Sequence, residues 1–133
     1  AETGYEVILI DPRETWGTAA RFPDVTIDRR WPSTAMADLA PDERTAVVTL
    51  CHDPKLDDPA LLVALESEAF YIGSLGSRRT HAKRVDRLTG EGVPEATMAR
   101  IHAPVGLDIG ARTPAEIALS VIAQVTEALR KVA

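Results

Sequence analysis

The sequence has one cysteine, no long hydrophobic run and no excess of basic residues, and each absence excludes a class of protein. Cys51 is alone, so it cannot form an internal disulfide, and its isolation is typical of a reducing compartment. No apolar stretch approaches the roughly 20 residues that span a bilayer, and no basic start followed by an apolar stretch indicates a signal peptide. The cytoplasm is therefore the expected location, without a membrane partner. The formal net charge of −5 argues against a nucleic-acid platform.

The basic residues that do occur are concentrated in one segment. Residues 77–90 hold five arginine and lysine residues against only Asp86, a local charge of +4, which leaves −9 for the rest of a chain whose net charge is −5. One basic patch on an acidic protein suggests a small anionic ligand. A solvated helix face is the alternative.

The 133 residues are expected to form a single α/β domain, residues 1–133, with a mostly parallel sheet. Short β-like runs alternate with helical stretches, which is the order of βαβ units. Three of the predicted strands are nearly continuous apolar runs, as in strands that are covered on both faces. The predicted strands are Tyr5–Ile10, Val25–Asp28, Thr45–Cys51 and Ala69–Ser74.

Cap residues predict where the helices begin. Asp58-Pro59 predicts a helix that runs to about Glu68, and Thr113-Pro114-Ala115-Glu116 is a capping box. Ser77 is the predicted cap of the basic helix, and a short helix is expected near Glu95–Arg100. In the basic helix, Ala82, Val85 and Leu88 are predicted to face inward and Arg79, Lys83 and Arg87 to share an outer face. In the last helix, the predicted core stripe is Ile117, Val121, Val125, Ala128 and Val132.

The start of the chain departs from a complete dinucleotide-binding fold. Ala1–Gly4 resembles the last turn of a helix with a glycine just past its end. The strand Tyr5–Ile10 follows at once and ends on Asp11, and in a dinucleotide-binding fold an acid at the end of the second strand binds ribose hydroxyls. The first strand and its glycine-rich turn are therefore expected to be missing from this chain.

The strongest candidate for a ligand site is Gly73–Arg79. A strand runs there into a glycine-containing turn and then a helix, which directs free backbone N–H groups at an anion. Two glycines, Gly73 and Gly76, permit close backbone approach, and the side chains of Ser77, Arg78 and Arg79 add hydroxyl and guanidinium donors. The segment lacks the lysine of a Walker loop and the spacing of a Rossmann fingerprint. A plain strand–helix turn with surface arginines is the alternative.

Two further segments carry polar residues where a ligand could bind. His52 and Asp53 follow the third predicted strand, and ligands of open α/β sheets bind outside the carboxyl ends of strands. Asp108 lies in the long irregular loop His102–Arg112, where it accepts bonds from a ligand or forms an ordinary Asx turn. The histidines do not have zinc-site spacing, and one cysteine cannot build a thiolate site, so no metal site is predicted.

Several segments, in the same order along nearly the whole chain, closely resemble the XdhC/CoxI family. They are Asp11-Pro12-Arg13, Arg21-Phe22-Pro23, Thr49–Pro54, Tyr71–Thr80, Arg100–Ala111 and Thr113–Ala118. The resemblance implies a three-layer, Rossmann-like C-terminal domain in an accessory factor for xanthine dehydrogenase and related molybdenum hydroxylases. Such a factor binds molybdenum cofactor, holds it while its sulfido ligand is installed, and passes it to the apoenzyme. Relative to the family, the chain is expected to be truncated at its N-terminus.

The leading hypothesis from this resemblance is a cofactor-binding chaperone rather than a catalyst, with no catalytic residues. Its partners are an apoenzyme of the xanthine dehydrogenase type and a sulfurtransferase, and its ligand is molybdopterin or the dinucleotide form. Ser77, Arg78 and Arg79, with amides near Gly73 and Gly76, hold the phosphate or pyrophosphate. Asp11 binds a ribose, and His52, Asp53 and Asp108 line the centre of the site.

Two other functions compete with this hypothesis. One is an NAD(P)-dependent oxidoreductase, which rests on fold-level analogy and lacks an acid–base pair such as Tyr-x-x-x-Lys. The other is a protein-docking module whose basic helix, residues 77–90, faces an acidic partner. The missing strand leaves three structural possibilities: a fragment, a homodimer in which a neighbouring chain supplies the edge contacts, or closure of the gap by strands 5–10 and 45–51.

Overall fold

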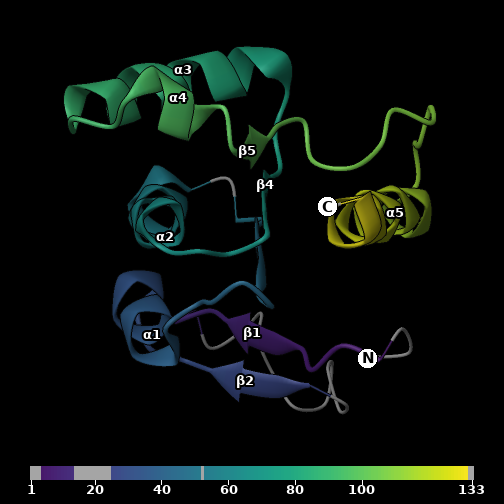
Figure 1. The fold of residues 1–133 in the computed structure, drawn as a ribbon, viewed down its shortest axis with the longest axis horizontal. Coiled ribbons are helices and arrows are strands. Elements are labelled where there is room, and N and C mark those ends of the chain that lie inside the picture. Colours follow the sequence, from purple (N-terminus) through teal and green to yellow (C-terminus); the bar gives the residue numbers. More distant parts are fainter. Residues whose placement is uncertain (1–3, 14–24, 52, 132–133) are drawn as a thin grey trace.

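The structure, a computed structural model, describes residues 4–13, 25–51 and 53–131. Strands and helices alternate along most of this length, as predicted (Figure 1). The strands are β1 (Ile8–Ile10), β2 (Thr26–Asp28), β3 (Ala46–Thr49), β4 (Tyr71–Ser74) and β5 (Ile101–His102). The helices are α1 (Pro32–Leu39), α2 (Pro54–Glu66), α3 (Arg78–Gly90), α4 (Glu95–Met98) and α5 (Pro114–Lys131).

In the part of the chain that the structure describes, neighbouring strands are parallel but form two sheets. β1 pairs with β2, and the second sheet has the order β3-β4-β5. The register places Val47 opposite Ile72, and Gly73 opposite His102. The expected parallel α/β architecture is confirmed, whereas the separation into two sheets decides one of the open possibilities: the strands near residues 5–10 and 45–51 do not pair with each other.

Helices cover both faces of the second sheet, which gives the predicted three layers. α1 packs against α2 and α2 against α3, while α5 lies on the other side of β4 (Figure 1). The larger core cluster joins Met36 of α1, Leu61 of α2, Ile72 of β4 and Leu88 of α3. A smaller cluster joins Tyr71, Val105 and Val125, and so attaches α5. None of the described helices is long and apolar enough to cross a membrane.

Two helices begin where their cap residues predict. The Ser77 hydroxyl accepts a hydrogen bond from the Thr80 N–H at 3.1 Å, and α3 starts at the next residue. At α5, Thr113 Oγ1 accepts from the Glu116 N–H at 3.1 Å while Glu116 Oε1 accepts from the Thr113 N–H at 3.2 Å. These reciprocal bonds are those of a capping box. The short helix expected near Glu95–Arg100 is α4.

The predicted start of α2 was wrong by one turn and a half. Asp53, not Asp58, is the cap, because its Oδ1 accepts a backbone N–H from two residues on at 3.0 Å. Both aspartates precede a proline, so local sequence does not separate them. Burial of Leu56 in the added turn favours the earlier start. Pro59 therefore lies inside the helix, where it has no N–H to donate to the preceding turn.

Other expectations also need correction. Ala82 of α3 is exposed, whereas Val85 and Leu88 contact the core as predicted and Arg84 is buried as well. Helix α1 and strand β5 were not predicted, and β5 takes His102 from the expected irregular loop. In α5, Val121, Val125 and Ala128 form the predicted core contact, whereas Val132 lies outside the described residues.

Within the described residues, the facing edges of the two sheets carry backbone groups without a strand partner. The Val7 carbonyl and the Asp11 N–H form backbone hydrogen bonds with β2. The carbonyls of Thr45 and Thr49 accept backbone hydrogen bonds from the residues on either side of β4. Residues alternate in direction along a parallel strand. The backbone N–H and C=O groups of Ile8 and Ile10, and of Ala46 and Val48, therefore point away from those partners, toward the space between the sheets.

Candidate functional site

The carboxyl ends of β3 and β4 are joined by buried polar contacts, which position the turn that follows β4. The hydroxyls of Thr49 and Ser74 share a hydrogen bond of 2.6 Å, and both side chains are buried. One residue further on, the Leu75 N–H donates to the Thr49 carbonyl at 2.9 Å. The first residues of the predicted ligand segment are thus tied to the neighbouring strand.

Beyond Leu75 the backbone forms an N–H-rich turn at the start of α3. The first N–H groups of a helix have no partner within it, and the Ser77 hydroxyl and carbonyl take up those of Thr80 and His81. The N–H groups before these make no hydrogen bond within the described residues, and they belong to Gly76, Ser77, Arg78 and Arg79. Because the positive end of the helix dipole adds to these donors, the turn suits an anion.

The two glycines of this segment have different roles in the structure. Gly76 has φ +137°, a conformation that other residues rarely adopt. A Cβ on Gly73 would meet the side chains of Tyr71 and Val105, so close packing requires a glycine there. The backbone freedom predicted for the turn is thus seen at Gly76, whereas the absence of a side chain at Gly73 serves the β4 interface with Val105.

The basic side chains of this region differ in their partners. Ser77, Arg78 and Arg79 are exposed at the helix start. Arg87, two turns further on, is paired with Asp58 of α2, with 2.7 Å between Nε and Oδ2. This pairing raises the pKa of Arg87. The exposed cations at the N–H-rich turn are therefore Arg78 and Arg79.

A second polar group lies at the carboxyl ends of β1 and β3. Arg13 donates hydrogen bonds to the carboxylate of Asp11 from its Nε, Nη2 and backbone N–H, at 2.9, 2.8 and 2.9 Å. Asp11 is buried, and the guanidinium of Arg13 holds its pKa below the usual value. Arg13 also donates to the Cys51 sulfur at 3.6 Å. Burial, followed by the charge of Asp57, raises the pKa of that thiol.

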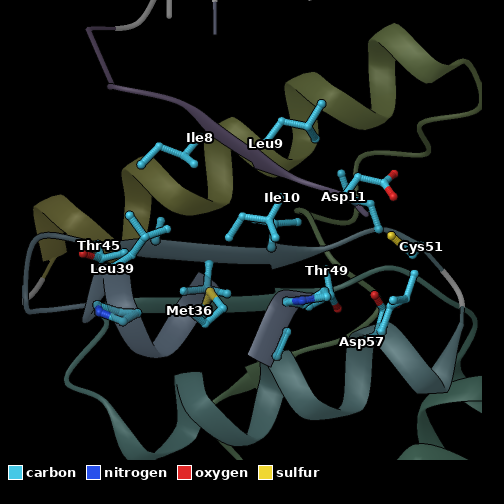
Figure 2. A pocket seen from close by; sticks show the side chains of 18 of the residues that line it. Ile8, Leu9, Ile10, Asp11, Met36, Leu39, Thr45, Thr49, Cys51 and Asp57 are labelled. Carbon is cyan, nitrogen blue, oxygen red and sulfur yellow. The ribbon is translucent and has the colours of Figure 1, made fainter. Parts of the chain in front are cut away.

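A cavity of about 430 Å³ lies between the two sheets and has this polar group at one end. Its walls are β1 and β3, and α1 and α2 contribute apolar side chains such as Met36 and Leu56. Figure 2 shows Asp11 and Cys51 together at one end, with Met36 and Leu39 toward the other. The cavity is thus elongated along two parallel strands, with apolar side chains along its length and polar side chains at their carboxyl ends.

The remaining predicted site residues are not joined to these two groups by direct contacts. Asp53 is used as the cap of α2, and His52 lies outside the described residues. Asp108 is exposed in the loop after β5. That loop is fixed against α5 because Gln124 Oε1 accepts from both the Tyr71 hydroxyl and the Gly106 N–H.

Three residues near the site were not singled out as site residues from the sequence. Arg13 was seen only as part of a motif, although its spacing of two residues from Asp11 is a detectable signal for a side-chain clamp. Asp57 is buried and lines the cavity. Arg84, also buried, reaches the turn after β4 from within α3. The burial of Asp57 and Arg84 could not be predicted, because a polar side chain on an amphipathic helix is expected to be exposed.

Comparison with known proteins identifies the family. The family model described as the XdhC Rossmann domain matches residues 1–125. The chain belongs to the XdhC family. This XdhC domain is 42% identical over 107 residues to a molybdenum cofactor insertion chaperone, PaoD, of Escherichia coli, with 80% of this chain and 33% of the relative covered.

Two further relatives agree with this assignment. A Bacillus subtilis protein, named as a probable subunit of xanthine dehydrogenase, is 31% identical over 134 residues, covering the whole XdhC domain and 38% of the relative. The crystal structure of a xanthine dehydrogenase from Bacillus halodurans superposes with a TM-score of 0.82 at 29% identity, over 99% of this chain and 38% of that one. The XdhC domain thus spans about a third of the length of the curated relatives named here.

Proposed function

We propose that this XdhC domain binds molybdenum cofactor as part of a chaperone that inserts the cofactor into enzymes of the xanthine dehydrogenase type. The likeness to a protein named as a molybdenum cofactor insertion chaperone supports this role. The observation that carries it is the N-terminus of α3, where an N–H-rich turn coincides with exposed Arg78 and Arg79. In this role the domain holds and delivers a ligand and performs no chemical step.

The residues present fit the phosphate end of that cofactor. A phosphate needs several convergent donors, and the turn offers backbone N–H groups, the Ser77 hydroxyl and two guanidinium groups. When bound, the cofactor carries the molybdenum centre used by the client enzyme. The domain's own residues bind and orient it: Ser77, Arg78, Arg79 and the backbone amides near Gly76 hold the phosphate or the pyrophosphate of a dinucleotide form, while Gly73 shapes the strand that leads into this turn.

The other site residues keep proposed roles around this anchor. Asp11 binds a ribose of the dinucleotide form in exchange for part of its bonding to Arg13, whose four hydrogen bonds occupy both carboxylate oxygens. His52, Asp53 and Asp108 line the centre of the site. We further propose that the bound cofactor is sulfurated by a sulfurtransferase before transfer to the apoenzyme, in the cytoplasm, and that the domain acts as a homodimer.

We also propose that one more parallel strand completes the sheet between β1 and β3. The unpaired backbone groups of Ile8, Ile10, Ala46 and Val48 support this, because a strand there would bond to both edges at once. The apolar lining of the cavity suits the side chains of a strand that is covered on both faces. Such a strand leads toward the polar end of the cavity, so it would complete the site as well as the sheet.

A binding titration with molybdopterin tests the proposed function. Arg79→Glu removes a charge-assisted bond worth about 1.5–3 kcal/mol, so the dissociation constant should rise by about 10- to 100-fold. Arg44→Glu is the matched control, because exposed Arg44 precedes β3 and so lies at the amino ends of the strands, away from the turn at their carboxyl ends. Equal affinity of the native protein and Arg79→Glu would exclude the turn as the phosphate site. Binding of NADP without molybdopterin would instead support the oxidoreductase.

A further inference from the structure

A buried arginine controls the backbone of the proposed phosphate turn. Arg84 lies in the second turn of α3 and is only 2% exposed. Its Nη2 donates to the Leu75 carbonyl at 3.1 Å, and its Nη1 bonds to His81 Nδ1 at 3.1 Å. Because arginine can only donate, His81 Nδ1 is the acceptor. The guanidinium therefore connects the interior face of α3 to the residue just before Gly76.

The bond to Leu75 determines which way the next N–H points. In a trans peptide the C=O and the N–H lie in one plane and point in opposite directions. The Leu75 carbonyl points to a buried guanidinium, so the N–H of Gly76 points to the other side, away from Arg84. The φ of +137° at Gly76 then turns the chain into the exposed start of α3. A peptide flipped at this place would present a carbonyl oxygen, which repels an anion, in place of a donor.

Packing alone does not account for a guanidinium at this position. Burial lowers the pKa of Arg84, although the charges of Asp57 and Asp58 on α2 oppose that shift. Its Nε has no hydrogen-bond partner within the described residues. A buried polar atom without a partner costs stability, which an apolar side chain of similar volume would avoid. Of the two hydrogen bonds that Arg84 makes, one holds the turn at Leu75 and the other holds the guanidinium against His81 of the same helix.

We infer that Arg84 is a positioning residue that fixes the Leu75–Gly76 peptide so that the Gly76 N–H faces the bound phosphate. This inference rests on the proposed function for the identity of the ligand, but not for the orientation of the peptide. Arg84 itself touches no ligand. Its effect is exerted through one carbonyl, and its removal should change the turn even without ligand.

The test compares Arg84→Gln and Arg84→Lys with Arg87→Gln by ¹H–¹⁵N NMR of the purified protein. Arg87→Gln is the matched control, since it removes the same charge from the same helix and breaks an exposed ion pair to Asp58 instead. We expect Arg84→Gln to shift the Gly76 amide resonance and the Leu75 carbonyl resonance, and to raise the exchange rate of the Leu75 N–H. Arg87→Gln should leave all three unchanged.

A titration with pyrophosphate as probe gives the functional readout. Arg84→Gln should weaken pyrophosphate binding by about tenfold, the equivalent of one hydrogen bond. Arg84→Lys keeps a cation that reaches the carbonyl and should restore most of the affinity; it also serves as the test variant if Arg84→Gln does not fold. Unchanged Gly76 and Leu75 resonances in a folded Arg84→Gln protein would overturn the inference. Shifted resonances together with unaltered molybdopterin affinity in Arg79→Glu would overturn the proposed function alone.

Discussion

The loops after β1 and after β4 both present arginine at the carboxyl ends of parallel strands, yet these arginines have different partners. Arg13 is bound through three donors to Asp11, two residues earlier. The loop after β2 repeats this Asp-x-Arg clamp, with Arg30 on Asp28 at the same atoms and similar distances. After β4, Ser77 stands two residues before Arg79 in place of an acid.

This difference shows that the availability of an arginine depends on the residue two positions before it. A clamped guanidinium has already exchanged water for a carboxylate, so an anionic ligand must displace that partner. Arg79 follows a hydroxyl that caps the helix and carries no charge, so its guanidinium remains open to an external anion. In the loops after β1 and β2 the arginine is bound to an aspartate of the same loop, whereas in the loop after β4 the arginine can bind an external ligand.

The largest effect is expected when an Asp-x-Arg clamp is introduced into the loop after β4. Ser77→Asp creates the Asp-x-Arg spacing before Arg79 and places a negative charge in the turn, so we expect molybdopterin affinity to fall by about 100-fold. Aspartate caps helices as well as serine, so stability should be retained. Ser77→Asn is the control, because it caps without charge. Titration and urea unfolding measure the two effects, and equal affinities of the two variants would contradict the comparison.

A second change opens the clamp after β1. Asp11→Asn should lower the free energy of unfolding at pH 7 by about 1–2 kcal/mol, because buried Asp11 loses charge-assisted bonds to Arg13. Arg13 lowers the pKa of Asp11 in the folded state, so this stabilisation is present above the unfolded pKa of about 4 and is lost as pH falls through the folded pKa. Urea unfolding at several pH values checks the sign. A difference that grows as the pH falls would contradict this origin.

The two sheets offer a comparison of exposed and paired backbone within single strands. Amide hydrogens of Ile8, Ile10, Ala46 and Val48 should exchange about tenfold faster than those of Leu9 and Val47, whose N–H groups point to paired strands. Hydrogen exchange followed by NMR measures this alternation. Equal protection of both sets would show that the facing edges are already covered.

The smallest effect is expected at the clamp after β2. The Asp28 side chain is 14% exposed against 7% for Asp11, while Arg30 and Arg13 are alike at 44% and 41%, so solvent screens the attraction after β2 more. Asp28→Asn should therefore lower the free energy of unfolding by about 0.5 kcal/mol. Urea unfolding of Asp28→Asn and Asp11→Asn side by side compares the stabilisation that the two clamps provide. A larger loss for Asp28→Asn would mean that burial does not determine their strength.

Cap residues and apolar runs predicted much of this fold because their effects are local. Ser77 and the Thr113–Glu116 box each bond to backbone within one turn, so their chemistry can be read from adjacent residues. Local sequence does not decide between the two Asp-Pro pairs. Asp53 and Asp58 give the same signal for a helix start, and the packing of Leu56 favours the start at Asp53. Helix α1 was not predicted because Trp31, the residue before it, is not a capping residue and makes no side-chain cap bond.

The candidate site was predictable in part for the same reason. The turn Gly73–Arg79 is continuous in sequence, and a strand–turn–helix order is enough to expect free N–H groups there. Arg84 and Asp57 depend on packing between α2 and α3, which brings distant residues together and which periodicity does not reveal. The contact between Arg13 and Cys51 likewise joins the segments that follow β1 and β3, two strands of separate sheets.

The separation of the sheets has a consequence for cooperativity. In the described residues, β1, β2 and α1 all precede β3 in the chain, and no sheet hydrogen bond connects them to the strands that follow. Their attachment passes through side chains, chiefly where Met36 of α1 packs in the cluster with α2. Without the added strand proposed above, β1, β2 and α1 can therefore open together without breaking a ladder of the β3-β4-β5 sheet. Asp11 and Arg13 would move with them, while the turn at Gly76 stays in place, so the two parts of the proposed site can form and dissolve independently.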